Sequence, residues 1–227
     1  MSASLGDELR IVLFTLEIAA LATLAILPLG IAVALLLARY RGPGKSLLET
    51  ALSLPLVLPP TAVGLVLLAL LARRGLVGRW LDAAGIEVVF TWRAALLAAM
   101  VMSFPLLVRS ARTAFEEVDP RLVALARTLG CGPAAAFFRV TLPLAWRGVL
   151  AGTVLAFARA LGEFGATIMI AGNIPGRTQT LALAIFHDTQ IGRDDRARLL
   201  VGVTVALAFA ALWSAEAITR RRSRAAS

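Results

Sequence analysis

The sequence predicts an all-α, polytopic membrane protein with about five transmembrane helices. Hydrophobic residues make up 59% of the 227 residues, and the mean hydropathy is +0.83, more than a water-soluble domain of this size can bury in one core. A helix needs about 20 apolar residues to cross the hydrocarbon core of a bilayer. Five apolar windows approach that length, at residues 11–37, 54–71, 94–108, 148–171 and 199–217. We therefore expect residues 1–227 to form a single transmembrane domain.

The first window is expected to remain in the protein as a helix and not to be a cleaved secretory signal. Asp7 and Glu8 accompany Arg10 ahead of it, so it lacks the basic leading region of a signal, and its apolar stretch is too long for one. Pro28 in this window and Pro105 in the third window each remove a backbone donor and predict a kink.

The stretch SLPLVLPP overlaps the start of the second window. Its Pro55, Pro59 and Pro60 lack backbone N–H groups and restrict the residues before them. We therefore expect no regular helix over this stretch, and a break or turn in the chain.

The longest polar segment lies between the third and fourth windows and predicts a pair of short helices outside the lipid, at residues 119–143. Asp119 can cap a helix whose first position is Pro120, and Gly130 can end that helix in the left-handed conformation. A second short helix is expected to follow and to end at Pro143. Such an amphipathic pair can lie on the membrane surface or enter a groove of a partner. The first helix carries an apolar stripe at helical spacing, formed by Leu122, Leu125, Ala126 and Leu129.

The fourth window carries two charges, Arg159 and Glu163, four residues apart and therefore on one helix face. An unpaired charge at membrane depth costs at least about 2.5 to 3.5 kcal/mol, so we expect the two to pair. Glu17 in the first window is a second possible partner for Arg159. One interpretation, which we favour, is a buried structural pair that orients helices around a central path. The other is that Arg159 supplies positive potential where an oxyanion passes.

Small residues predict close helix packing in the last two windows. Gly162 and Gly165 loosen the fourth window around its charges. Small residues that recur every four positions let two helix backbones approach closely. Packing within the bundle and packing across a dimer are equally compatible with this pattern. The recurring residues are Gly148, Gly152, Ala156 and Ala160 in one window, and Gly202, Ala206, Ala210 and Ser214 in the other.

Between these windows we interpret residues 173–180 as an outer loop rich in hydrogen-bond donors. The loop can touch an anion briefly, or it can be an ordinary solvated loop that contacts a binding protein, and we favour the second interpretation. Residues 181–192 hold an apolar stretch too short to span a bilayer and predict a half-helix beside an outer vestibule. The donors of the loop are Arg177, Thr178, Gln179 and Thr180.

Charge and the scarcity of ligating residues exclude several classes of function. The formal net charge is +9, but Lys and Arg are scattered through the loops, which argues against a nucleic-acid partner. They are more numerous in the loops that lie inside when the amino terminus is outside and the carboxyl terminus cytoplasmic, as the positive-inside rule requires. This predicts a multi-pass protein of a bacterial inner membrane, in contact with lipid. Cys131 and His187 are the only residues of their types, so we expect no metal site and no cofactor.

The run ALARTLGCGPAAAFFRVTLP resembles the signature loop of bacterial ABC-importer permeases, with Gly130 followed by VTLP at residues 140–143. The resemblance implies a type I ABC importer permease fold, in which this loop holds a coupling helix that docks on a cytoplasmic ATPase subunit. Ala124 stands where the family has Glu, so an ion pair made by that Glu is absent. By this resemblance the docking residues are Ala124, Leu125, Ala126, Gly130, Val140, Leu142 and Pro143.

Residues 157–180 are similar to the molybdate branch of this permease family, whose neighbouring branches carry sulfate and tungstate. The similarity covers nearly the whole chain. It implies a homodimer that carries a tetrahedral oxyanion, with molybdate as the first candidate, together with cytoplasmic ABC ATPase subunits and a periplasmic oxyanion-binding protein. The chain has no G-x-x-x-x-G-K-[ST] phosphate loop. ATP would therefore be hydrolysed by a partner chain, and the permease itself would not be an enzyme.

Two alternatives belong to other classes. An ion-coupled secondary transporter would use Glu163 as a proton site, but many such proteins are built from two related halves and no repeat of one half in the other is visible here. A membrane-embedded enzyme is disfavoured because one His, one Cys and no paired carboxylates within a span leave little from which to assemble an active site.

Overall fold

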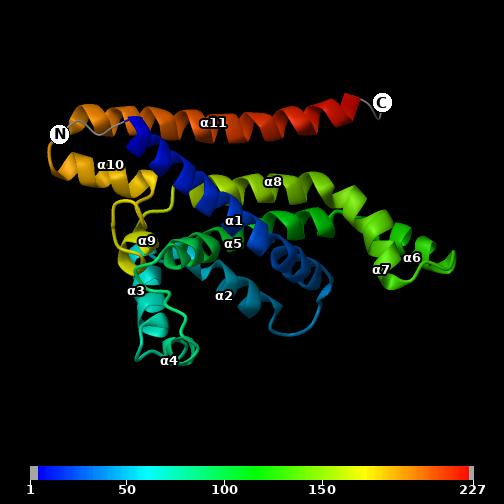
Figure 1. Cartoon of the computed structure of the whole chain (residues 1–227). Coiled ribbons are helices and arrows are strands. Elements are labelled where there is room, and N and C mark those ends of the chain that lie inside the picture. Colours follow the sequence, from blue (N-terminus) through cyan, green and yellow to red (C-terminus); the bar gives the residue numbers. More distant parts are fainter. Residues whose placement is uncertain (1–4, 225–227) are drawn as a thin grey trace.

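The computed structural model describes residues 5–224, whose regular elements are all helices (Figure 1). Residues 1–4 and 225–227 lie outside this range. They include the two termini, for which the sequence predicts opposite sides of the membrane. In chain order the helices are α1 (Leu5–Arg39), α2 (Lys45–Val57), α3 (Pro60–Leu71), α4 (Gly78–Ala83), α5 (Trp92–Glu116), α6 (Pro120–Thr128), α7 (Pro133–Ala136), the π-helical turn η1 (Phe137–Thr141), α8 (Leu142–Leu161), α9 (Gly165–Ile170), α10 (Leu181–Gln190) and α11 (Asp194–Arg224).

Within the described residues, four helices are long and apolar enough to cross a membrane: α1, α5, the continuous helix Pro133–Leu161, and α11 over Asp194–Ser214. The pair α2 and α3 adds a fifth if its two halves, bent by 107°, are taken as one span. The predicted all-α fold with about five spans is confirmed. In Figure 1, α5, α8 and α11 run in roughly the same direction, and α1 crosses them obliquely.

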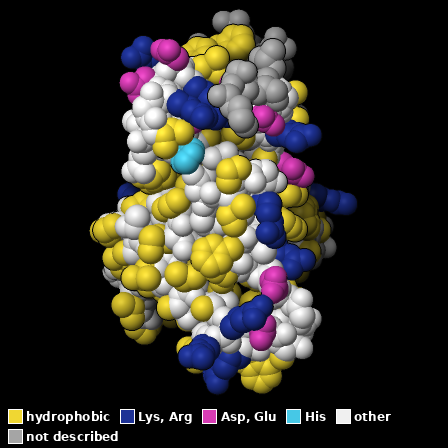
Figure 2. All heavy atoms as spheres, turned by 60° about the vertical axis from the view of Figure 1, so that its left-hand side comes forward, with side chains coloured by type: hydrophobic (Ala, Val, Ile, Leu, Met, Phe, Trp, Pro, Cys, Tyr) yellow, Lys and Arg dark blue, Asp and Glu magenta, His cyan; other side chains and the backbone are white. Residues whose placement is uncertain are grey.

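The surface has the distribution expected of a protein that sits in a bilayer. Figure 2 shows hydrophobic side chains over much of the middle of one face, whereas charged side chains gather at its top and bottom and along one edge. Large apolar side chains are exposed on the outermost helices, among them Leu13 and Leu24 of α1 and Val205 and Phe209 of α11. Such a surface is stable against lipid chains or a partner's helices, but would aggregate in water.

Helix α5 is central to the bundle because it packs against both α1 and α8. A Cβ atom added to Gly148 would overlap the Cβ of Ala114, and one added to Gly152 would lie 2.9 Å from the Cβ of Ser110. The Ser110 hydroxyl donates to the carbonyl of Gly148 across the same contact, at 2.9 Å. The small-residue stripe of α8 therefore faces α5. The stripe of α11 does not pack in this way, since no atom lies within 4 Å of a Cβ added to Gly202.

The prediction that no regular helix covers SLPLVLPP is wrong for the first part of this stretch, because α2 continues through Pro55 to Val57. A single proline removes only one backbone hydrogen bond, which this helix tolerates. The predicted break is confirmed within the same stretch, at Leu58 and Pro59, which have ψ values of 144° and 131°. Each of them precedes a proline, and a residue before proline avoids the helical region because it clashes with the ring. Two successive prolines therefore produce the sharp bend between α2 and α3.

The helix that contains the fourth span begins earlier than predicted, because α7, η1 and α8 form one helix from Pro133 to Leu161. The second short helix predicted for the inner loop therefore does not end at Pro143. In η1 the backbone pairs five residues apart, and the N–H of Leu142 donates to the carbonyl of Phe137. This wider turn directly precedes Pro143 and accommodates it, because a proline ring and missing N–H would disrupt a regular α-helix at this interior position.

We expect Gly148→Ala to lower the thermal unfolding temperature of the detergent-solubilised chain, because the added methyl group has no room against Ala114. Overpacking of this kind costs about 1 to 3 kcal/mol. Gly202→Ala is the matched control, since it adds the same methyl group to open space and should change the unfolding temperature little. Ala114→Gly should restore the Gly148→Ala variant. Equal unfolding temperatures for the two glycine variants would contradict the close packing of α8 on α5.

Candidate functional site

The fourth span is broken inside the bundle, and its two charges lie at the break. Helix α8 ends at Leu161 and α9 begins at Gly165. Arg159 lies in the last turn of α8, and its Nη1 is 2.7 Å from Oε2 of Glu163 in the break. The Glu163 side chain is 2% exposed, whereas that of Arg159 is 25% exposed. The buried carboxylate is thus paired with a guanidinium that still reaches solvent-accessible space.

The second oxygen of Glu163 satisfies the backbone at the start of α9. Its Oε1 accepts a hydrogen bond from the N–H of Ala166 at 2.8 Å. The first N–H groups of a helix have no partner within the helix, so this carboxylate caps α9 while its other oxygen contacts Arg159. Because a buried carboxylate is costly unless it is paired and hydrogen-bonded, these two contacts explain how Glu163 can lie inside the bundle.

The break in the fourth span meets the break in the second span. Helix α9 packs on α3, and a Cβ added to Gly165 would lie 2.6 Å from the Cβ of Pro60. A Cβ added to Gly64 would lie 2.8 Å from the Cα of Ala166. Irregular backbone at membrane depth is tolerated only where protein or a water-filled cavity surrounds it. Packing of the two breaks against each other supplies that surrounding, and glycine is required at the contact.

The chain after α9 turns back into the protein, so the solvated-loop interpretation of residues 173–180 is wrong for its last three residues, whereas residues 175–177 are exposed. Thr178, Gln179 and Thr180 are at least nine-tenths buried, and only Arg177 among the four predicted donors is exposed. The Thr178 hydroxyl accepts from the N–H of Ile174 at 3.0 Å. Its side chain therefore satisfies the backbone of its own loop and is not available to a passing solute.

A threonine of α1 fixes the start of α10. The Thr15 hydroxyl accepts from the N–H of Leu181 at 2.9 Å and donates to the carbonyl of Ile11 at 2.7 Å. Helix α10, at Leu181–Gln190, is too short to span a bilayer. It packs on α11 and on the amino-terminal end of α1, through a small core that includes Leu200.

Glu17 does not take the role of second partner for Arg159. It is exposed on α1, and the described part of the chain contains no ion pair between it and Arg159. Thr15, Ile18 and Ala19 are the buried residues of this turn. Glu17 lies on the other side of the helix from them because successive residues are rotated by about 100°. It lines a separate cavity near the start of α5.

The 119–143 loop contains α6, α7, η1 and the first two residues of α8. Within it, α6 begins and ends where the sequence predicts. The Asp119 carboxylate accepts from the N–H of Arg121 at 2.8 Å. At the other end Gly130 has φ of +86°, and the N–H of Cys131 donates to the carbonyl of Ala126 at 3.0 Å. This six-to-one bond with a left-handed glycine is a Schellman cap.

The apolar stripe of α6 is not covered by the rest of the described chain. No residue of α6 is buried, and Leu122, Leu125 and Leu129 are 44%, 57% and 77% exposed. Phe138 in η1 is also exposed. Contiguous apolar surface outside a span marks an interaction site. The continuous helix Pro133–Leu161 connects this surface directly to the break that holds Glu163.

An ion-pair network that the sequence did not predict joins α2 to α5 at the end of the bundle that carries the 119–143 loop. Lys45 Nζ lies 3.2 Å from Oε1 of Glu116, and Arg112 pairs with Glu49. The i,i+4 spacing of Lys45 and Glu49 and of Arg112 and Glu116 is visible in the sequence. Spacing alone does not show that the two pairs belong to helices that pack together.

A second missed network joins three helices at the opposite end. Arg196 of α11 lies 3.2 Å from the carboxylate of Asp188 in α10 and 3.6 Å from that of Glu8 in α1. Asp188 is 1% exposed, so it depends on Arg196 for its charge partner. This network and the Thr15 hydrogen bond hold α1, α10 and α11 together.

We expect Arg159→Ala to destabilise the protein by roughly 3 kcal/mol, because it leaves the buried Glu163 carboxylate without a charge partner. Adding Glu163→Gln should recover much of this loss, since the amide oxygen can still cap Ala166 without carrying a charge. Thermal unfolding of the detergent-solubilised variants measures both effects. An equal loss in the single and double variants would show that the pair does not stabilise the fold.

Comparison with known proteins identifies the family. Residues 26–224 match the family described as binding-protein-dependent transport system inner membrane component. The chain is 50% identical over 216 residues to the molybdenum transport system permease protein ModB of Escherichia coli K12, with 94% of each chain covered. It is 41% identical to ModB of Haemophilus influenzae, with 96% of each covered. It is also 36% identical to the sulfate transport system permease protein CysT of E. coli K12, covering 86% of this chain and 70% of that protein.

Solved structures show the same fold at low sequence identity. The MetNI methionine ABC transporter in an inward-facing conformation aligns with a TM-score of 0.72 at 18% identity, over 94% of each chain. A bacterial ABC transporter that imports alginate aligns with a TM-score of 0.76 at 18% identity, over 96% of this chain and 80% of that one. The family match covers most of the sequence, and the resemblance inferred from the sequence is confirmed. This chain therefore belongs to the family of binding-protein-dependent transport system inner membrane components.

Proposed function

We propose that this chain is the membrane-spanning subunit of an ATP-driven importer of a tetrahedral oxyanion, with molybdate as its substrate. The observation that carries the proposal is the 50% identity to a molybdenum permease over 94% of both chains. The sulfate permease is a more distant relative by identity and coverage. Sulfate and molybdate share charge and shape, so the two relatives point to the same class of substrate.

The proposed assembly is a homodimer with cytoplasmic ATPase subunits and a periplasmic oxyanion-binding protein. One related structure is an alginate ABC transporter in complex with a substrate-bound periplasmic protein, which supports a binding-protein partner here. The exposed small-residue stripe of α11, at Gly202 among others, is suited to contact a second copy. In this arrangement the amino terminus is outside, and the carboxyl terminus and the 119–143 loop are cytoplasmic, as the distribution of Lys and Arg favours.

Coupling is proposed to run through the 119–143 loop. The exposed leucines of α6 would enter a groove on the ATPase as an amphipathic helix does, joined there by Val140, Leu142 and Pro143. Closure of the ATPase on ATP would then displace the loop. Because one helix joins the loop to the break at Glu163, that displacement would reach the packed breaks of the second and fourth spans. Packed cores have discrete arrangements, so the motion would switch the bundle between inward-open and outward-open states.

In this proposal Arg159 holds the break in place and does not carry the substrate. Both oxygens of Glu163 are engaged, one by Arg159 and one by the N–H of Ala166. A proton-coupled transporter would need Glu163 to release its partners in each cycle. The double engagement of this carboxylate supports a structural role and argues against the secondary-transporter alternative.

Gly130→Val should impair docking of the ATPase, because a β-branched residue is strained at the left-handed φ of +86° that ends α6. Gly132→Val is the matched control, since Gly132 has an ordinary φ of −63° and nothing lies within 4 Å of an added Cβ. ATP-dependent uptake in reconstituted vesicles, and retention of the ATPase during purification, should fall several-fold for Gly130→Val alone. Equal behaviour of the two variants would argue against a role for this cap in coupling.

Substrate identity is tested by competition in the reconstituted transporter. Uptake of labelled molybdate should require ATP, should be suppressed by unlabelled molybdate or tungstate, and should be suppressed only weakly by sulfate. Uptake that collapses with the proton gradient while ATP is present would refute the proposed energy source. Stronger suppression by sulfate than by molybdate would indicate that the chain is a sulfate permease.

A further inference from the structure

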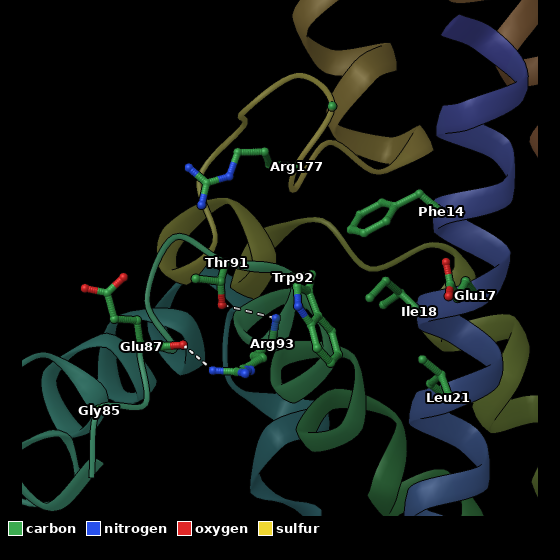
Figure 3. Close-up of a pocket in the computed structure, with 11 residues that line it drawn as sticks. Phe14, Glu17, Ile18, Leu21, Gly85, Glu87, Thr91, Trp92, Arg93 and Arg177 are labelled. Atoms are coloured by element: carbon green, nitrogen blue, oxygen red, sulfur yellow. Dashed lines mark hydrogen bonds between the residues drawn. The ribbon is translucent and has the colours of Figure 1, made fainter. Parts of the chain in front are cut away.

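An open cavity of about 790 Å³ lies beside the start of α5, away from the break at Glu163. Figure 3 shows its walls, with Phe14, Glu17, Ile18 and Leu21 of α1 on one side and the turn that leads into α5 on the other. Arg177, from the segment after α9, closes the top of this view. The volume is in the range of small-molecule sites. Nothing in the proposed transport cycle uses it.

The charged groups of the cavity are balanced in sign. Glu17, Glu87, Arg93 and Arg177 line it. Within the described residues, Glu87 is already paired with Arg73 at 2.8 Å, and Arg93 donates to the carbonyl of Glu87 at 3.1 Å. The side chains of Glu17 and Arg177 have no ion pair or hydrogen bond with the rest of the described chain. The cavity therefore offers one free carboxylate on the α1 side, and one free guanidinium and a second, hydrogen-bonded guanidinium on the opposite side (Figure 3).

The position of the cavity is that of a lipid–water boundary. Trp92 is the first residue of α5, is 45% exposed and carries the Arg93 guanidinium 5.8 Å from its ring centre. Tryptophan is enriched where spans meet the headgroups. Leu21 is likewise partly exposed, at 42%, and extends the α1 wall of the cavity toward the apolar surface of that helix. One wall is thus apolar and open to lipid, and the other is charged.

Glu17 lines this cavity without a charge partner, and a carboxylate beside lipid is normally paired or hydrated. The described residues supply no cation for it. A dedicated oxyanion site is a poor explanation, since Glu17 and Glu87 would repel a divalent anion as it entered. A ligand with a cationic and an anionic group side by side, joined to an apolar chain, matches the lining.

We propose that this cavity binds the headgroup of an aminophospholipid of the phosphatidylethanolamine type. The phosphate would be held by Arg177 and Arg93, as guanidinium groups hold phosphate through paired N–H donors. The primary ammonium would donate to Glu17. The first part of an acyl chain would lie along Leu21, Phe14 and the Trp92 ring. The lipid would tie α1 to α5 and to the segment that follows α9.

Native mass spectrometry of the detergent-solubilised full chain, titrated with single lipids of identical acyl chains, tests this proposal. Wild-type protein should bind phosphatidylethanolamine in preference to phosphatidylglycerol, which lacks the ammonium, and to phosphatidylcholine, whose quaternary ammonium has no N–H donor. Glu17→Gln should reduce the preference over phosphatidylglycerol by about tenfold, the effect of one charge-assisted contact. Arg177→Gln should weaken the binding of all three lipids.

The controls are Asp7→Asn and Arg10→Gln, which make the same charge changes at exposed positions of α1 outside the cavity. Both should bind lipid as wild type does. Equal affinity of the wild type for phosphatidylethanolamine and phosphatidylcholine would overturn the proposal without any variant. An unchanged lipid preference in Glu17→Gln would also overturn it, as would displacement of bound lipid by free phosphoethanolamine at equal concentration. Absence of bound lipid from the dimer in the same mass spectra would overturn it as well.

Discussion

Hydrocarbon offers no partner to a polar group, and the architecture of this chain follows from where its backbone and charges find partners inside the protein. The second span breaks at Leu58 and Pro59, and the fourth breaks before Gly165. Each break leaves backbone groups without helical partners, so neither could face lipid. They pack against each other instead, with Gly64 and Gly165 at the contact, and Glu163 caps the buried start of α9.

The need to pair every polar group inside the bilayer also determines where the proposed transporter can move. The fourth span is interrupted at the break before Gly165, and one helix, Pro133–Leu161, leads from it to the turn that joins α6 and its exposed leucines. The ion pairs between α2 and α5 and those around Arg196 lie at the two ends of the bundle. In the proposed transporter, a helix connects the ATPase-docking surface to the packed breaks of the second and fourth spans. Through this connection the ATPase could switch the permease between two packed states.

Local signals in the sequence predicted the parts of the fold that depend on near neighbours. The Asp119 cap, the Gly130 stop and the Arg159–Glu163 spacing each depend on residues a few positions apart, and the structure contains all three features. Contacts between distant segments were not predictable in this way. Burial of Thr178 follows from packing of its loop against the bundle, and passage of the chain through Pro143 depends on the widened turn η1.

The central claim is that the 119–143 loop lies in the cytoplasm, at the far end of the helix that holds the broken site. Cys131 is the only cysteine of the chain and carries a free, partly exposed thiol within this loop. Labelling of Cys131 with a membrane-impermeant maleimide measures its side of the membrane without any substitution. We expect labelling in inverted membrane vesicles stripped of peripheral subunits, and none in intact spheroplasts. Labelling in intact spheroplasts would put the loop outside, beyond the reach of an ATPase, and would contradict the account.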